Sequence, residues 1–291
     1  MKATECSDGR LAVSVGTGMF ARIAILGGLF LYAYYPVISG LVADWLAHRE
    51  YSHAFLVPVL SMYLLWKRRR NLSALGTPSL VGLGVLGIGL AALWLGSLSG
   101  EDIIQRLSLP LTLFGLVYFT TAWRTARVCL FPFCYLLLMI PVPFPLYKTM
   151  AIQLRLFDAA LVSSWASTLG VPVLLDGYLL HLPRITLEVA DSCSGTLSIL
   201  ALVALGTFYI SELDLPFVRK AVLWIVMIPI SVLANVIRIL IVVLFVHYSG
   251  NWVLETTFHQ LTGMVNFVFG FTMVMIVGYF MRRSPRAERI E

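Results

Sequence analysis

The sequence predicts an all-α, polytopic membrane protein. Of its 291 residues 59% are hydrophobic and only 12% are charged, and the mean hydropathy is +0.88. A soluble core cannot bury that much apolar material, so the composition is typical of an integral membrane protein. The net charge of +6 does not indicate a nucleic-acid partner, because in a membrane protein the placement of positive charge around the spans is what matters.

Eight apolar runs are candidate spans, since a transmembrane helix needs roughly 20 apolar residues. They cover residues 20–42, 52–66, 79–98, 108–123, 128–142, 193–210, 218–247 and 258–281. With the amino terminus inside, 15 of the 21 Lys and Arg residues fall on the inner side, as the positive-inside rule requires. Without the short second run, the basic cluster 67–70 would lie outside. We therefore expect about eight crossings with both termini cytoplasmic.

The chain reads as a single membrane domain, 1–291. We expect a cytoplasmic amino-terminal segment (1–19), an outer segment (143–192), a catalytic-helix region (193–281) and a basic cytoplasmic tail (282–291). Within the outer segment, residues 146–169 have apolar residues at helical spacing and predict an amphipathic helix on the membrane surface. The Asp176-Gly177 pair between β-prone runs predicts a small β-hairpin just before the sixth span.

A cysteine stands at the start of the sixth run. Asp191 or Ser192 can cap this helix, which places Cys193 in the first turn. The helix dipole favours an anion there and lowers the pKa of a thiol. The alternative is that Cys193 is simply a small hydrophobic residue.

A charged residue lies inside the seventh run. An ionised side chain in a span is costly unless it faces protein or water, so Arg238 is a functional candidate, with Asn235 three residues earlier on the same helix face. A structural pair of Arg238 with Glu188 or Glu255 is the alternative. His259 opens the eighth run on the same side of the membrane; alone, it is typical of an interface residue.

Together these residues predict acyl-transfer chemistry. Cys193 would be the nucleophile, His259 the acid and base, and Arg238 the cation that stabilises the thiolate or the oxyanion. The spacing of cysteines and histidines fits no metal site, so no cofactor is expected. Further residues that could line or support the pocket are Asn235, Ser194, Gly195, Ser198, Glu188 and His53.

The same residues resemble a known family of membrane cysteine transpeptidases. The matching elements are Val189-Ala190 before Cys193-Ser194-Gly195, Ser198, the pair Asn235 and Arg238, and His259 with Gly263, together with an amino-terminal signature at 51–58 and 63–66. This pattern is similar to the exosortase/archaeosortase family, and a histidine at position 259 is similar to its bacterial exosortase branch. Ala54 departs from the pattern, where glycine is expected.

The resemblance implies a sorting enzyme in the bacterial inner membrane with its active site on the periplasmic side. Its substrates would be exported proteins with a carboxy-terminal Pro-Glu-Pro-type motif, a membrane helix and a basic end. The acyl group would pass to an unknown acceptor, a surface polysaccharide or a lipid. Membrane lipid would surround the spans.

Two other functions remain open from the sequence. A transporter or flippase of polysaccharide or lipid intermediates would use Arg238 and Asn235 to bind an anionic headgroup. It should tolerate the loss of the Cys193 thiol. A non-catalytic scaffold of a polysaccharide-export system would tolerate changes at all three of Cys193, Arg238 and His259.

Overall fold

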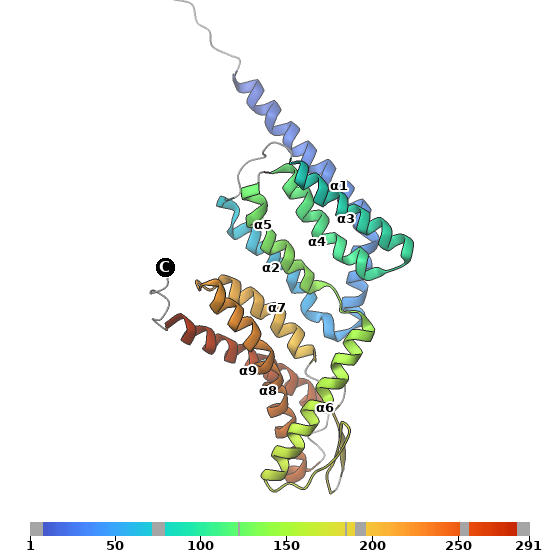
Figure 1. Cartoon of the computed structure of the whole chain (residues 1–291), viewed down its shortest axis with the longest axis vertical. Helices are drawn as coiled ribbons and strands as arrows, with labels where there is room; N and C mark the ends of the chain where they lie inside the picture. Colours follow the sequence, from blue (N-terminus) through green and yellow to red (C-terminus); the bar gives the residue numbers. More distant parts are fainter. Residues whose placement is uncertain are drawn as a thin grey trace, which may run out of the picture. The chain divides into compact units, whose positions relative to one another are not determined.

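The structure is a computed structural model that describes residues 8–71, 79–121, 123–183, 185–189, 196–250 and 256–283. The described chain is mainly helical, with one small antiparallel sheet (Figure 1). Within these described ranges, five helices are long and apolar enough to cross a membrane. The predicted class, a multi-pass α-helical membrane protein, is therefore confirmed. Contacts divide the chain into two units, residues 1–44 with 73–126, and residues 45–72 with 127–291.

The first unit contains α1 (Asp8–Ala47) as far as residue 44, α3 (Leu80–Ser99) and α4 (Asp102–Thr120). The last two form a tight antiparallel pair because glycines on α3 let the backbones touch. A β-carbon at Gly82 would lie 2.4 Å from the backbone nitrogen of Phe119. The buried Tyr34 hydroxyl joins α1 to α4 through hydrogen bonds with Ser108 (2.9 Å) and Thr112 (2.6 Å).

The second unit begins with η1 (Arg49–Phe55), α2 (Leu56–Lys67) and η2 (Arg69–Asn71), and resumes within α5 (Trp123–Tyr135) and η3 (Leu136–Met139). Pro132 lacks an N–H, so the Val128 carbonyl loses its helical donor. The Arg68 guanidinium approaches that carbonyl at 3.5 Å. Ser61 of α2 donates to the Pro132 carbonyl at 2.8 Å, so these contacts join α2 to α5.

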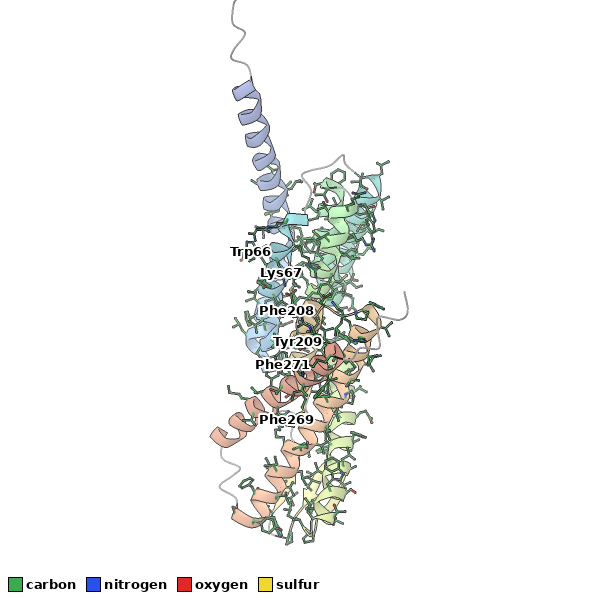
Figure 2. All side chains as sticks on the ribbon, turned by 90° about the vertical axis from the view of Figure 1, so that its left-hand side faces the viewer. Trp66, Lys67, Phe208, Tyr209, Phe269 and Phe271 are labelled. Carbon is green, nitrogen blue, oxygen red and sulfur yellow. The ribbon has the colours of Figure 1, made fainter. Side chains whose placement is uncertain are left out.

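The longest helices follow in α6 (Phe144–Thr168), α7 (Thr196–Glu212), α8 (Phe217–Ser249) and α9 (Thr256–Arg283). Within this unit α7, α8 and α9 pack on one another, and α6 packs on α8 (Figure 1). Tyr209 of α7 meets Phe271 of α9 with ring centroids 6.0 Å apart, while Phe269 lies two residues nearer the beginning of α9 (Figure 2). Lys67 of α2 forms an ion pair with Glu212 at the end of α7.

The eight predicted runs do not all form helices of spanning length. Helices from runs 1, 3, 4, 7 and 8 meet the length and composition of a span, and a sixth span is counted if the bent pair Trp123–Met139 and Phe144–Thr168 is one. The bend of 77° follows from Pro141 and Pro143, which disfavour helix at and before their positions. The second run forms only the short α2, and the sixth contributes the short apolar helix Ser198–Glu212.

The predicted hairpin is present and carries a third strand. The strands are β1 (Leu174–Asp176), β2 (Leu179–His181) and β3 (Thr186–Glu188), in the order β1-β2-β3 with antiparallel pairing throughout. The turn between β1 and β2 places Gly177 at φ 59°, a left-handed conformation that glycine adopts without strain. Asp176 pairs with Leu179 across this turn.

The core of the second unit joins the sheet to α6 and α8. Its buried members are Ala159, Val162, Ala166, Val171, Leu180, Leu182, Val189, Val236, Ile239 and Val243. Because the last residue before the 190–195 segment belongs to this core, the chain that leads to Cys193 is anchored on the same packed face as α6 and α8. Small and β-branched side chains allow the close approach of these elements.

The helix predicted at 146–169 is confirmed, but two of its three charged residues are buried, and only Lys148 is exposed. Arg155 is 8% exposed and Asp158 only 1%, whereas Phe144, Leu146 and Phe157 are 54–71% exposed. The expectation of an amphipathic surface helix placed those charges on the outer face. In apolar surroundings the preference reverses, because a charge is less costly inside the protein than against lipid.

Candidate functional site

Arg238 lies on α8 and reaches toward α9. The side chain is partly buried, and its Nη2 is buried without a hydrogen-bond partner among the described residues. A β-carbon at Gly263 of α9 would lie 3.6 Å from Nη1. The glycine therefore leaves room for the guanidinium beside the α9 backbone. A buried donor of this kind can bind an anionic or developing negative oxygen.

Asn235 and Asp158 form a polar contact next to Arg238. The Asn235 Nδ2 donates to Oδ2 of Asp158 at 2.7 Å, and both side chains are 1% exposed. Burial disfavours the ionised form of Asp158, and the Asn235 hydrogen bond and the charge of Arg238 offset that cost in part; Asp158 and Arg238 form no direct ion pair within the described part of the chain. α6 and α8 thus meet through a carboxyl group and an amide, about one helical turn from Arg238 on α8.

A second buried hydrogen bond joins the beginning of α7 to α9. The Asn266 Nδ2 donates to Oγ of Ser198 at 3.2 Å, and the two side chains are 4% and 7% exposed. Ser198 lies in the first turns of α7, and Asn266 lies one turn after Gly263 on α9. Residues three or four apart share a helix face. The contacts of Ser198 and Arg238 therefore fall on the same stretch of α9.

His259 lies in the first turns of α9, within the helix that begins at Thr256. It precedes Gly263 by one turn, so the two positions lie on one face of the helix. The backbone thus brings position 259 to the side of α9 that Arg238 approaches. The His259 side chain lies outside the described part of the structure.

Cys193, Ser194 and Gly195 lie outside the described residues. The described chain leads to this segment at Val189, which is 2% exposed and donates its N–H to the Tyr178 carbonyl at 3.1 Å. It resumes at Thr196, where α7 begins. The expected separations of roughly 4–8 Å among the Cys193, Arg238 and His259 side chains stay predictions.

Two of the predicted supporting residues, His53 and Glu188, differ in burial. His53 of η1 is 8% exposed, its Nδ1 is buried without a partner among the described residues, and η1 packs on α7. Burial lowers the pKa of His53 below its ordinary value of 6.5. Glu188 of β3 is exposed. The alternative pair of Arg238 with Glu188 is not formed within the described residues; Glu255 lies outside them.

Asp158 is the residue at this site that the sequence interpretation missed. Asp158 stands between the apolar residues Phe157 and Ala159. A charged residue in that setting was expected on the polar, exposed face of an amphipathic surface helix. The sequence could have identified Asp158 if α6 had been treated as a lipid-contacting helix, because a carboxylate in such a helix is expected to face a protein partner. The nearest complementary sequence feature was the Asn235 and Arg238 pair on α8.

A known protein family matches most of the chain. The family model of the transmembrane exosortase matches residues 45–278, which is most of the chain and includes Asp158, Cys193, Arg238 and His259. No curated protein and no solved structure matches the sequence. The chain therefore belongs to the transmembrane exosortase family.

Proposed function

We propose that the protein is a cysteine transpeptidase that cleaves carboxy-terminal sorting signals of exported proteins at the membrane interface. Family membership supports a membrane transpeptidase of the exosortase type. The observation that carries the residue assignment is the approach of Arg238 to Gly263 on α9, one helical turn from His259. The buried bond from Ser198 to Asn266 brings the start of α7, just after Cys193, to the same helix.

The proposed reaction begins with a proton transfer. His259 takes the proton of the Cys193 thiol, and the thiolate attacks the scissile carbonyl carbon. Arg238 donates hydrogen bonds to the oxyanion of the tetrahedral intermediate, where a fixed cation is worth most because charge develops there. His259 then protonates the leaving amine as the C–N bond breaks. A thioester remains on Cys193.

The second half of the reaction transfers the acyl group. A nucleophile on the acceptor, a surface polysaccharide or a lipid, loses its proton to His259 and attacks the thioester carbonyl. The thiolate leaves as the new bond forms, and the proton that His259 has taken returns to it, which restores the thiol and the neutral imidazole. A substrate held by its own membrane helix would present a Pro-Glu-Pro-type motif at the interface, with its basic end retained inside.

The roles are tested with a tagged substrate in membranes, with enzyme level checked for every variant. Cys193→Ala should abolish processing, whereas Cys129→Ala, which removes a buried cysteine of α5, should process normally. Arg238→Lys should be nearly as damaging as Arg238→Ala, because lysine lacks the planar fork of donors. His259→Ala should retain some activity that rises with pH. Normal processing by Cys193→Ala would exclude the proposed enzyme and favour a transporter or a scaffold.

Placement in the membrane is tested with the same protein. We propose the bacterial inner membrane, with both termini cytoplasmic and the site on the periplasmic side. Reporter fusions after Arg70 and Arg283 should score cytoplasmic, and a fusion within 176–184, at the β1–β2 turn, should score periplasmic. A cytoplasmic score for the fusion at the turn would contradict the proposed side of catalysis.

A further inference from the structure

The proposed reaction gives no task to either buried charged residue of α6, Arg155 or Asp158, and the carboxyl group of Asp158 is the more deeply buried. It projects from α6 and is 1% exposed. Oδ2 accepts the hydrogen bond from Asn235, whereas Oδ1 is buried without a partner among the described residues. A buried carboxylate of this kind costs several kcal/mol unless another charge compensates it. The burial of Asp158 therefore either lowers the stability of the fold or is compensated by another charged group at the site.

The compensating charge available on α8 is Arg238. Its charge acts on Asp158, and its own Nη2 is buried without a partner in the described chain. Asn235 lies about one turn before Arg238 on the same helix face, and its amide donates to Asp158. Each charge therefore reduces the cost of burying the other, although the two side chains do not form a direct ion pair within the described residues.

We propose that Asp158 is a positioning residue that orients the Asn235 amide and balances the charge of Arg238, so that the guanidinium stays extended toward Gly263. As an acceptor, the carboxylate determines which end of the Asn235 amide faces α6. Because Asp158 bonds to Asn235 and forms no direct ion pair with Arg238 in the described chain, the donors of Arg238 remain available to a substrate oxygen. The kinetic part of this inference depends on the proposed function. The charge coupling between Asp158 and Arg238 does not.

The competing explanation is that Asp158 only joins two helices by a hydrogen bond. Asp158→Asn separates the two explanations because asparagine keeps the shape and one accepting oxygen but loses the charge. A helix-joining role predicts little change in this variant. A charge-balancing role predicts a loss that depends on Arg238.

Stability gives the first measurement. The apparent melting temperature of the full-length protein in detergent is compared for Asp158→Asn, Arg238→Gln and the double variant. Asp158→Asn should lower it by about 6 °C or more when Arg238 is present and by less than about 2 °C when Arg238 is already replaced. Asp176→Asn, the same change at an exposed site on β1, is the control and should leave it unchanged. Losses that simply add would overturn the inference.

Activity gives the second measurement. Asp158→Asn should lower kcat by about tenfold or more while KM stays within about twofold, because a transition-state interaction is lost. The exchange Asp158→Asn with Asn235→Asp moves the carboxylate across the same hydrogen bond and should restore at least about a third of the wild-type rate. Should Asp158→Asn not accumulate as folded protein, the exchange variant still carries the test. An exchange as inactive as Asp158→Asn would contradict charge balance.

The two proposals can fail separately. If Cys193→Ala processes normally while the melting temperatures remain coupled, the chemistry assigned to the site is wrong and the Asp158–Arg238 balance stands. If Cys193→Ala is inactive and the melting temperatures are additive, the enzyme stands and Asp158 loses its positioning role.

Discussion

Gly263 offers a graded test of the assignment of Arg238. A β-carbon there would lie 3.6 Å from Nη1 of the arginine, which is an ordinary van der Waals contact. Gly263→Ala should therefore fit without moving the guanidinium. Alanine also favours a helix interior by about 1 kcal/mol over glycine, so this variant should be at least as stable as the wild type.

A valine at the same position should behave differently. Its γ-carbons extend about 1.5 Å beyond the β-carbon, and β-branching leaves one strongly preferred rotamer in a helix. A carbon directed at Arg238 would come within about 2 Å of Nη1, so the guanidinium must withdraw by at least about 1.5 Å to regain contact distance. A catalytic group misplaced by about 1 Å can cost about 10²-fold in rate. We expect Gly263→Val to lose about that much.

The assay is the rate of processing of a tagged substrate per folded enzyme in detergent. Gly270→Val is the matched control, because the same helix there faces apolar atoms, Leu202 Cδ2 at 3.7 Å and Ala234 Cβ at 3.9 Å from a β-carbon. That control should lower the yield of folded protein without a comparable loss of specific activity. Wild-type activity of Gly263→Val, or an Ala variant as inactive as Arg238→Ala, would refute the geometric argument.

Three further predictions concern stability. Gly82→Ala should destabilise the folded protein by about 1–3 kcal/mol, because a β-carbon would lie 2.4 Å from the α4 backbone. A β-carbon at Gly84 meets nothing within 4 Å, so Gly84→Ala should be neutral or stabilising. Equal unfolding midpoints of the two variants in detergent would contradict this. Burial lowers the pKa of His53 below 6.5, so as pH falls below about 6.5 the unfolded chain gains this proton first and stability declines. His53→Gln should flatten that decline in melting temperature between about pH 6.5 and 5, and His48→Gln at an exposed position should not. Tyr34→Phe should cost about 1–3 kcal/mol by leaving two buried hydroxyl groups without their shared partner; an unchanged midpoint would argue against that network.

The long apolar runs were predictable because the membrane sets their length. The run at 79–98 corresponds to α3, and the run at 218–247 to α8. Shorter runs were less informative, since proline divides them. Pro58 lies in the first turn of α2, where a helix tolerates proline. The residues before α2 form the 3₁₀ helix η1. Hydropathy alone does not detect that division.

The turn of the small sheet was predictable from local chemistry, whereas its third strand required pairing information. Gly177 has the left-handed conformation expected of the Asp-Gly turn. Thr186–Glu188 is a short strand that exists because Leu180 and Leu187 pair across the sheet and pack on α6 and α8. Such a pairing depends on a core formed by distant parts of the chain.

Arg238 and Asn235 could be selected from the sequence because they interrupt a span, whereas Asp158 could not be selected by the same hydrophobic pattern. In water, the charged face of an amphipathic helix predicts the exposed face. In an apolar environment the charged positions predict the inward face, and exposed Leu146 with buried Asp158 on α6 follows the second rule. Applied to α6 and α8 together, that rule predicts a carboxylate on one helix opposite a guanidinium on the other.

The consequence reaches the segment that contains Cys193 through ordinary packing. Val189, the last described residue before 190–195, is buried in the core that α6 and α8 share, and these two helices also carry Asp158 and Arg238. Close-packed cores respond to changes in position over short distances. A shift of α6 after loss of the Asp158 charge would therefore move both the cation and the anchor of the cysteine segment, whereas a change at Gly263 acts on the cation alone. The rate of Cys193 alkylation should accordingly change more in Asp158→Asn than in Gly263→Val. A larger change in Gly263→Val would show that the anchor at Val189 does not depend on the Asp158 charge.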